Sequence, residues 1–219
     1  MDLGIIQITN NNKKRQKMLI EDDIITKCIK VSQGNYTLVS PENDNLRHSV
    51  EKMGGFFSLY TAWDKDMSRK WRQGIQTRNE EWLAFFADDV YPDEEWYLEM
   101  SNYLKGRLPG QYGFRLTDFN DTRHEFGEDW MQFPNKRLGL THRPLAYDIG
   151  TGYVESSPTA YVANCIVHRD VLKIIEPFGI FGAAPDVSWS MAIRSCGFPI
   201  NFNPKAKCYH IGDREDNRK

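Results

Sequence analysis

Near the middle of the chain stands the sequence Trp82-Leu83-Ala84-Phe85-Phe86-Ala87-Asp88-Asp89-Val90-Tyr91-Pro92-Asp93. Its first five residues are apolar without a polar break, which is typical of a strand buried on both faces in a parallel sheet. Open α/β sheets bind ligands outside the carboxyl ends of their strands, where Asp88 and Asp89 would lie. Two adjacent carboxylates repel each other, and a divalent cation is the usual reason for keeping them together. An ordinary acidic turn before a helix is the alternative.

The composition indicates a folded protein with a sizeable core. The 219 residues are 40% hydrophobic and 13% aromatic, which argues against general disorder. The formal net charge of -2 provides no overall attraction to nucleic acid or to an anionic membrane. We see no apolar run of membrane-spanning length and no apolar signal region at the N-terminus. The four cysteines lack metal-type spacing, so we expect free thiols and a cytoplasmic protein.

Apolar periodicity predicts alternating strands and helices in the first half of the chain. The expected strands are residues 4–9, 36–39 and 56–60, and the expected helices are residues 18–29 and 64–79. In the second helix, Met67, Trp71 and Ile75 are spaced by four and share one face. We expect its many basic residues to lie in solvent, as charged helix faces usually do.

The second half contains two helices with recognisable ends and one segment that resists assignment. Asp93 would cap a helix that ends at Gly106, and a later helix over residues 187–196 would end at Gly197. The other expected elements are strands at residues 113–118, 161–167 and 205–209 and a short helix capped by Asp170. Residues 119–157 fit no element, and irregular segments of that length are usually functional. Without repeats or a linker, we expect one domain, residues 1–212, and a polar tail, residues 213–219.

Three segments together resemble the GT-A glycosyltransferases, specifically glycosyltransferase family 2. They are the strand ending in Asp88-Asp89, the helix opened by Asp186 and closed by Gly197-Phe198, and Cys208-Tyr209-His210-Ile211-Gly212. The family has a strand running into an Asp-rich metal motif, then an acidic helix with a Gly-aromatic end, then a Tyr-His-Gly close. The resemblance covers most of residues 74–212. It implies an α/β fold, a single Rossmann-like GT-A domain with a mostly parallel central sheet flanked by helices.

The resemblance also implies a reaction, its sugar donor and the residues that bind this donor. The chain would transfer a sugar from a nucleotide-sugar, with a UDP-sugar as first choice, to a hydroxyl acceptor with inversion at the anomeric carbon. The departing diphosphate needs a cation, and Asp89 and His210 would hold Mn²⁺ or Mg²⁺. An imidazole ligand favours Mn²⁺, although an ordinary strand-end histidine is the alternative for His210. The implied nucleotide-sugar-binding residues are Thr9, Asn10, Asn43, Asp44, Arg72 and Asp88.

Asp186 is the candidate general base of that reaction. An acceptor hydroxyl must lose its proton as it attacks the anomeric carbon, and a carboxylate within reach can accept it. A helix N-terminus would keep this carboxylate ionised, because the helix dipole stabilises an anion there. A simple N-cap is the alternative role for Asp186.

The acceptor and two other function classes stay open at this point. Saccharide, lipid-linked and protein hydroxyls are candidates. The basic residues 13–17 and the basic helix with Trp63 and Trp71 could bind a nucleic-acid backbone, so a hydroxymethylated base in DNA, as in phage-type glucosylation, is another. The alternatives to a glycosyltransferase are a non-catalytic nucleotide- or sugar-binding homologue and a metal-dependent phosphoryl-transfer enzyme. The sequence does not indicate an oligomeric state.

Overall fold

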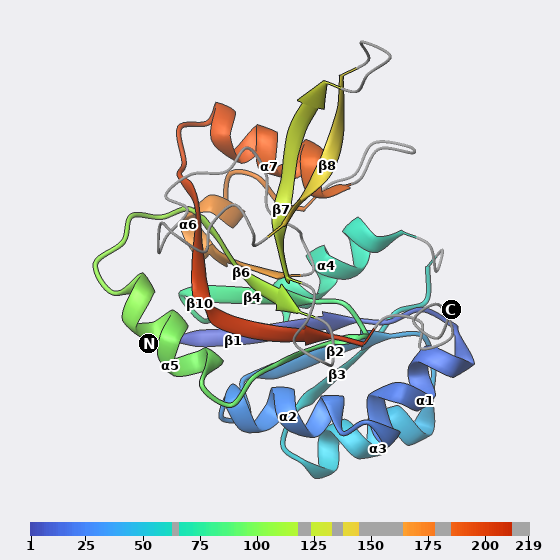
Figure 1. The fold of residues 1–219 in the computed structure, drawn as a ribbon. Coiled ribbons are helices and arrows are strands. Elements are labelled where there is room, and N and C mark those ends of the chain that lie inside the picture. Colours follow the sequence, from blue (N-terminus) through green and yellow to red (C-terminus); the bar gives the residue numbers. More distant parts are fainter. Residues whose placement is uncertain (63–65, 118–123, 133–137, 145–163, 178–184, 212–219) are drawn as a thin grey trace.

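A computed structural model describes residues 1–62, 66–117, 124–132, 138–144, 164–177 and 185–211 of the chain (Figure 1). Its central sheet has the strand order β3-β2-β1-β4-β9-β6-β10-β5. The predicted α/β class is confirmed. The segments 119–123, 133–137 and 145–157 of the unassigned stretch and the predicted tail lie outside the described residues, and the prediction of a single domain over residues 1–212 stays a prediction.

The sheet is parallel in its first half and mixed in its second. Four neighbouring parallel strands are β3 (Phe56–Leu59), β2 (Tyr36–Ser40), β1 (Leu3–Ile8) and β4 (Trp82–Phe86). Beyond them, β9 (Asn164–His168) is antiparallel to both β4 and β6 (Gln111–Thr117). The last pair is β10 (Ile200–His210), parallel to β6, and β5 (Val90–Pro92), antiparallel to β10. The strands β7 (His124–Gln132) and β8 (Leu138–Pro144) form a hairpin that continues from β6 (Figure 1).

Helices cover both faces of the sheet and define two hydrophobic cores. One core lies under α1 (Lys13–Glu21), α2 (Ile24–Val31), α3 (Asp44–Lys52) and α5 (Trp96–Leu104). The other lies under α4 (Met67–Gln76), α6 (Arg169–Leu172) and α7 (Pro185–Ser195). Strand β4 shows why its apolar run is continuous. Trp82, Ala84 and Phe86 face the first core, whereas Leu83 and Phe85 face the second, so both faces are buried.

Several predicted boundaries were wrong. The helix expected over residues 18–29 is two helices, because the chain turns between α1 and α2 at Asp23, which has φ 55°. The apolar stripe misled because both helices pack on the same core. The sequence pattern also did not predict α3 and β5, nor β7 and β8, which lie in the stretch 119–157 left without an element. His168, not Asp170, caps α6, since its Nδ1 accepts the Asp170 N–H at 3.1 Å.

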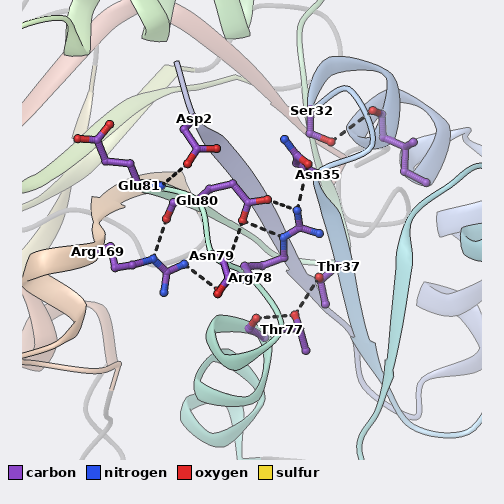
Figure 2. Close-up of polar contacts among 12 residues, drawn as sticks. Asp2, Ser32, Asn35, Thr37, Thr77, Arg78, Asn79, Glu80, Glu81 and Arg169 are labelled. Carbon is purple, nitrogen blue, oxygen red and sulfur yellow. Dashed lines mark hydrogen bonds and ion pairs between the residues drawn. The ribbon is translucent and has the colours of Figure 1, made fainter.

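A polar cluster holds the amino end of β4, opposite the acidic pair (Figure 2). The Glu80 carboxylate accepts hydrogen bonds from Arg78 Nε and Asn79 N, each at 3.0 Å. Arg169 donates from Nε to the Glu80 carbonyl at 2.8 Å and from Nη2 to the Arg78 carbonyl at 2.9 Å. Arg78 Nη2 also reaches Asn35 Oδ1 at 3.2 Å, so this cluster joins the entry of β4 to the chain before β2 and to α6.

Gly74 lets α4 lie close against the sheet. A Cβ atom at Gly74 would stand 2.3 Å from Ile6 Cγ2 and 3.2 Å from Val39 Cγ2. Alanine is about 1 kcal/mol better than glycine in a helix interior, but here the close approach outweighs that gain.

We therefore expect Gly74→Ala to lower the free energy of unfolding by about 1–3 kcal/mol in urea titrations. Gln76→Ala, at an exposed position of the same helix, is the control and should change it by less than about 0.5 kcal/mol. A Gly74→Ala protein as stable as the control would contradict this packing.

Candidate active site

The two candidate carboxylates lie in a tight turn that is fixed by the buried side-chain amide of Gln7. The Val90 N–H donates to the Ala87 carbonyl at 3.2 Å, which puts Asp88 and Asp89 at the two central positions of the turn. Gln7 of β1 is fully buried, and its Nε2 donates to the Ala87 carbonyl at 2.6 Å and to the Val90 carbonyl at 3.0 Å. The turn is thus fixed over the carboxyl end of β1, the location predicted for a ligand site.

Asp88 faces the loop that follows β1. Thr9 Oγ1 donates to Asp88 Oδ2 at 2.8 Å, so two of the residues predicted to bind the donor are in contact. Burial and the neighbouring Asp89 charge raise the pKa of Asp88, although the Thr9 hydroxyl and the Arg15 charge partly offset this. The site therefore contains one carboxylate whose charged form is disfavoured.

Asp89 meets His210, which arrives from the far end of the chain. Because β10 pairs with β5 so that His210 lies opposite Val90, the imidazole comes beside Asp89. His210 Nε2 lies 2.9 Å from Asp89 Oδ2, and the Ile211 N–H donates to the Asp89 carbonyl at 2.9 Å. The predicted convergence of Asp89 and His210 is confirmed; their metal role stays a prediction.

Arg15 of α1 contacts the same oxygen of Asp89 and was not predicted. Its Nη1 pairs with Asp89 Oδ2, and the two side chains are only 19% and 7% exposed. Burial alone would raise the pKa of Asp89. The hydrogen bond and charge of His210, together with Arg15, outweigh burial and hold that pKa below its usual value. Asp89 is therefore a buried, ionised carboxylate with two partners.

Lys70 is fully buried, contrary to the expectation that the basic residues of its helix lie in solvent. Its Nζ donates to the Thr9 carbonyl at 2.8 Å and to Asn10 Oδ1 at 2.7 Å, so α4 fixes the loop after β1. Trp71 is buried against Phe85, with ring centroids 5.2 Å apart. Lys70 and Trp71 are therefore buried and do not form the exposed nucleic-acid surface that the sequence suggested. Trp63 lies outside the described residues.

The other predicted donor-binding residues differ in their distance from this centre. Asn43 caps α3 through the Leu46 N–H, and its Nδ2 donates to Gln16 Oε1 at 2.8 Å. Gln16 Nε2 in turn donates to the Asn10 carbonyl at 2.9 Å, which links Asn43 to the loop after β1. Asp44 is exposed in the first turn of α3. Within the described residues, no hydrogen bond joins Asp44 or Arg72 to the acidic turn.

The backbone of Asp186 lies in the first turn of α7, and its side chain lies outside the described set. The helix is anchored one turn later by Trp189, which is fully buried and packs edge-on against Phe85 of β4, with ring centroids 5.5 Å apart. The predicted helix is confirmed, and the role of Asp186 as base stays a prediction.

The donor atoms of Asp89 and His210 fit a divalent cation as a partial ligand set. Asp89 Oδ2 and His210 Nε2 are oxygen and nitrogen ligands of the types that Mn²⁺ accepts, and they lie 2.9 Å apart, in hydrogen-bond contact. Within the described ranges, no group of three His, Cys, Asp or Glu residues could hold a metal. Diphosphate oxygens and water would have to complete such a site.

Solved structures share this architecture. No protein-family model and no curated protein matches the chain. GalNAc-T7, in a crystal structure with UDP, GalNAc and Mn²⁺, aligns with a TM-score of 0.66 over 97% of this chain and 44% of its own, at 10% identity. A fragment of S. aureus TarS with UDP aligns with a TM-score of 0.63 over 99% of this chain and 62% of its own, at 12% identity. The same fragment with UDP-GlcNAc gives a TM-score of 0.62 and 13% identity, over 97% of this chain and 59% of the fragment.

The chain has the GT-A fold. It spans about half the length of these three structures, between 44% and 62%. The predicted GT-A fold is thus confirmed, with a sheet that contains the four parallel strands β3, β2, β1 and β4 and the parallel pair of β6 and β10. Across the described ranges, every helix is too short or too polar to span a bilayer.

The two carboxylates should differ in their effect on stability. Asp88→Asn removes a desolvated charge while the amide oxygen can still accept from Thr9, so we expect about 0.5–1 kcal/mol more stability at pH 7. Asp89→Asn weakens contacts to Arg15 and His210, so we expect a loss of about 1–3 kcal/mol. Urea unfolding of both variants measures these changes.

The stability changes of the two variants should depend on pH in different ways, because the pKa of Asp88 is raised and that of Asp89 is lowered. The raised pKa of Asp88 costs wild-type stability above that pKa, so the advantage of Asp88→Asn should shrink on acidification. The lowered pKa of Asp89 stabilises above its unfolded value and is lost as pH falls through the folded pKa, so the Asp89→Asn deficit should persist to lower pH. A destabilised Asp88→Asn protein at pH 7 would contradict the electrostatics described.

Proposed function

We propose that this GT-A chain transfers a sugar from a nucleotide-sugar, a UDP-sugar in the first instance, to a hydroxyl acceptor. The observation that carries the proposal is the gathering of Thr9, Asp88, Asp89 and His210 over the carboxyl ends of β1 and β4. That is where open α/β sheets bind nucleotides. The UDP in the GalNAc-T7 structure and the UDP-GlcNAc in a TarS structure support the donor class.

The residues of this chain would divide the donor between them. The loop after β1, whose Thr9 and Asn10 carbonyls accept from Lys70 and Gln16, would place these two residues beside the nucleotide. Asp89 and His210 would hold Mn²⁺ or Mg²⁺, and the Mn²⁺ of the GalNAc-T7 structure supports the former. When bound, the ion would neutralise the charge that develops on the departing diphosphate.

Asp186 completes the proposal as the general base, with inversion at the anomeric carbon. The N-terminus of α7 would keep its carboxylate ionised, as a proton acceptor must be. Among acceptors, we propose a saccharide hydroxyl over a base in DNA, because the burial of Lys70 and Trp71 removes two of the residues that favoured nucleic acid. The four free cysteines support a reducing setting, the cytoplasm.

Donor binding and turnover test the proposal separately. UDP with Mn²⁺ should raise the melting temperature, because a ligand that binds only the native state stabilises it by mass action. With a UDP-sugar, the protein should slowly release UDP. A non-catalytic binder would show the shift without release, a phosphoryl-transfer enzyme would give another product, and no shift with any nucleoside diphosphate would refute the proposal.

Asp186→Asn should separate a base from a residue that only stabilises the helix. Asparagine has the size of aspartate and replaces it in the first turn of α7, so the melting temperature and the UDP-induced shift should stay nearly unchanged. Turnover should fall roughly 100-fold or more, the usual contribution of a positioned base. Asp170→Asn is the matched control. Asp170 is an exposed residue in the first turn of α6, and its variant should turn over like the wild type. An Asp186→Asn enzyme with near wild-type turnover would leave Asp186 only a structural role in the first turn of α7.

A further inference from the structure

We propose that Arg15 occupies the cation position on Asp89 until a nucleoside diphosphate draws its guanidinium away, so that the site takes a divalent cation only together with the diphosphate. The inference rests on the proposed donor class and assigns Arg15, which was not among the predicted donor-binding residues, as a positioning residue of the donor site.

The geometry places two donors on one carboxylate oxygen. Arg15 Nη1 and His210 Nε2 both contact Asp89 Oδ2, and the Asp89 side chain is only 7% exposed. A metal ion that used this oxygen and the imidazole nitrogen would have to replace the contact with Arg15. The guanidinium therefore stands where a bound cation would stand.

Charge makes simultaneous occupation unfavourable. Arg15 is always protonated, and with Asp89 it forms a pair that is mostly shielded from water. Repulsion between a guanidinium and a dication a few ångströms apart is strong in such surroundings, because little water screens it. Without a further anion, Arg15 and a metal ion thus compete for Asp89.

A diphosphate changes this balance, because it offers Arg15 a better partner. Guanidinium groups bind phosphate oxygens through two parallel hydrogen bonds. Arg15 lies in the first turn of α1, and the Asn12 side chain accepts its backbone N–H at 3.3 Å, which fixes the backbone at this position. The guanidinium can therefore move to the diphosphate while its backbone stays in place. Asp89 Oδ2 would then be released from the guanidinium and could hold the ion together with His210.

The test measures Mn²⁺ binding to the full chain without nucleotide, from the electron paramagnetic resonance signal of free Mn²⁺. Arg15→Gln should bind Mn²⁺ at least tenfold more tightly than the wild type. The same variant should bind UDP, measured by calorimetry without metal, at least tenfold more weakly. Lys17→Gln is the control, since Lys17 lies on the same helix with a side chain that is 69% exposed and paired with Glu21; both of its affinities should stay within twofold.

A second measurement uses the wild-type protein and so does not depend on the folding of the variant. In ¹⁵N-arginine spectra, the Arg15 Nε–H signal should move on addition of UDP and stay in place with Mg²⁺ alone. Unchanged or weaker Mn²⁺ binding by a folded Arg15→Gln protein, or an Arg15 signal that moves with Mg²⁺ alone, would overturn the proposal. A wild-type protein that binds no UDP would instead refute the proposed donor, while the Mn²⁺ affinities would still report on Arg15 and Asp89.

Discussion

The candidate site depends on a buried amide, that of Gln7, in the central strand. Gln7 donates both of its amide hydrogens to the carbonyls of Ala87 and Val90, and its Oε1 accepts the Tyr36 hydroxyl at 2.7 Å. A buried amide without these partners would be costly, so the core of the sheet and the shape of the acidic turn are coupled. The conformation of this turn places Asp88 beside the loop after β1 and Asp89 beside the end of β10. Removing the amide would thus disturb both carboxylates at once.

Much of the fold could be predicted because three strands of the parallel half, β1, β2 and β4, bury both faces. The uninterrupted apolar run of β4 is buried completely only in a strand that is covered on both faces. In α4, the spacing of Trp71 and Ile75 by four residues is enough to identify the face that packs on the sheet. The antiparallel half could not be predicted in this way. The three residues of β5 carry too little pattern, and β9 is placed between β4 and β6 by pairing over long sequence distances. The break at Asp23 was hidden because α1 and α2 present one continuous apolar stripe to the same core.

Only those site residues could be predicted that lie at the ends of strands or in the motifs that resemble the glycosyltransferase family. Asp88, Asp89, Thr9 and His210 meet because they follow strands that end at one edge of the sheet. The residues that hold them were missed for a physical reason. Arg15, Gln16 and Lys70 look like ordinary surface positions of polar helices, and nothing local marks a lysine whose Nζ is enclosed by the Thr9 carbonyl and the Asn10 amide. Such buried polar contacts depend on how α1 and α4 pack against the sheet, which sequence periodicity does not specify.

The two halves of the sheet meet at Asp89, where we expect the nucleotide to bind. A crystal structure of the full chain with UDP and Mn²⁺ would show its position. We expect the diphosphate over the carboxyl ends of β1 and β4, beside the loop of Thr9 and Asn10, with Asp89 and His210 turned toward it. UDP bound elsewhere, for example in the groove between α2 and α5 lined by Lys27, Tyr97 and Tyr209, would contradict this expectation.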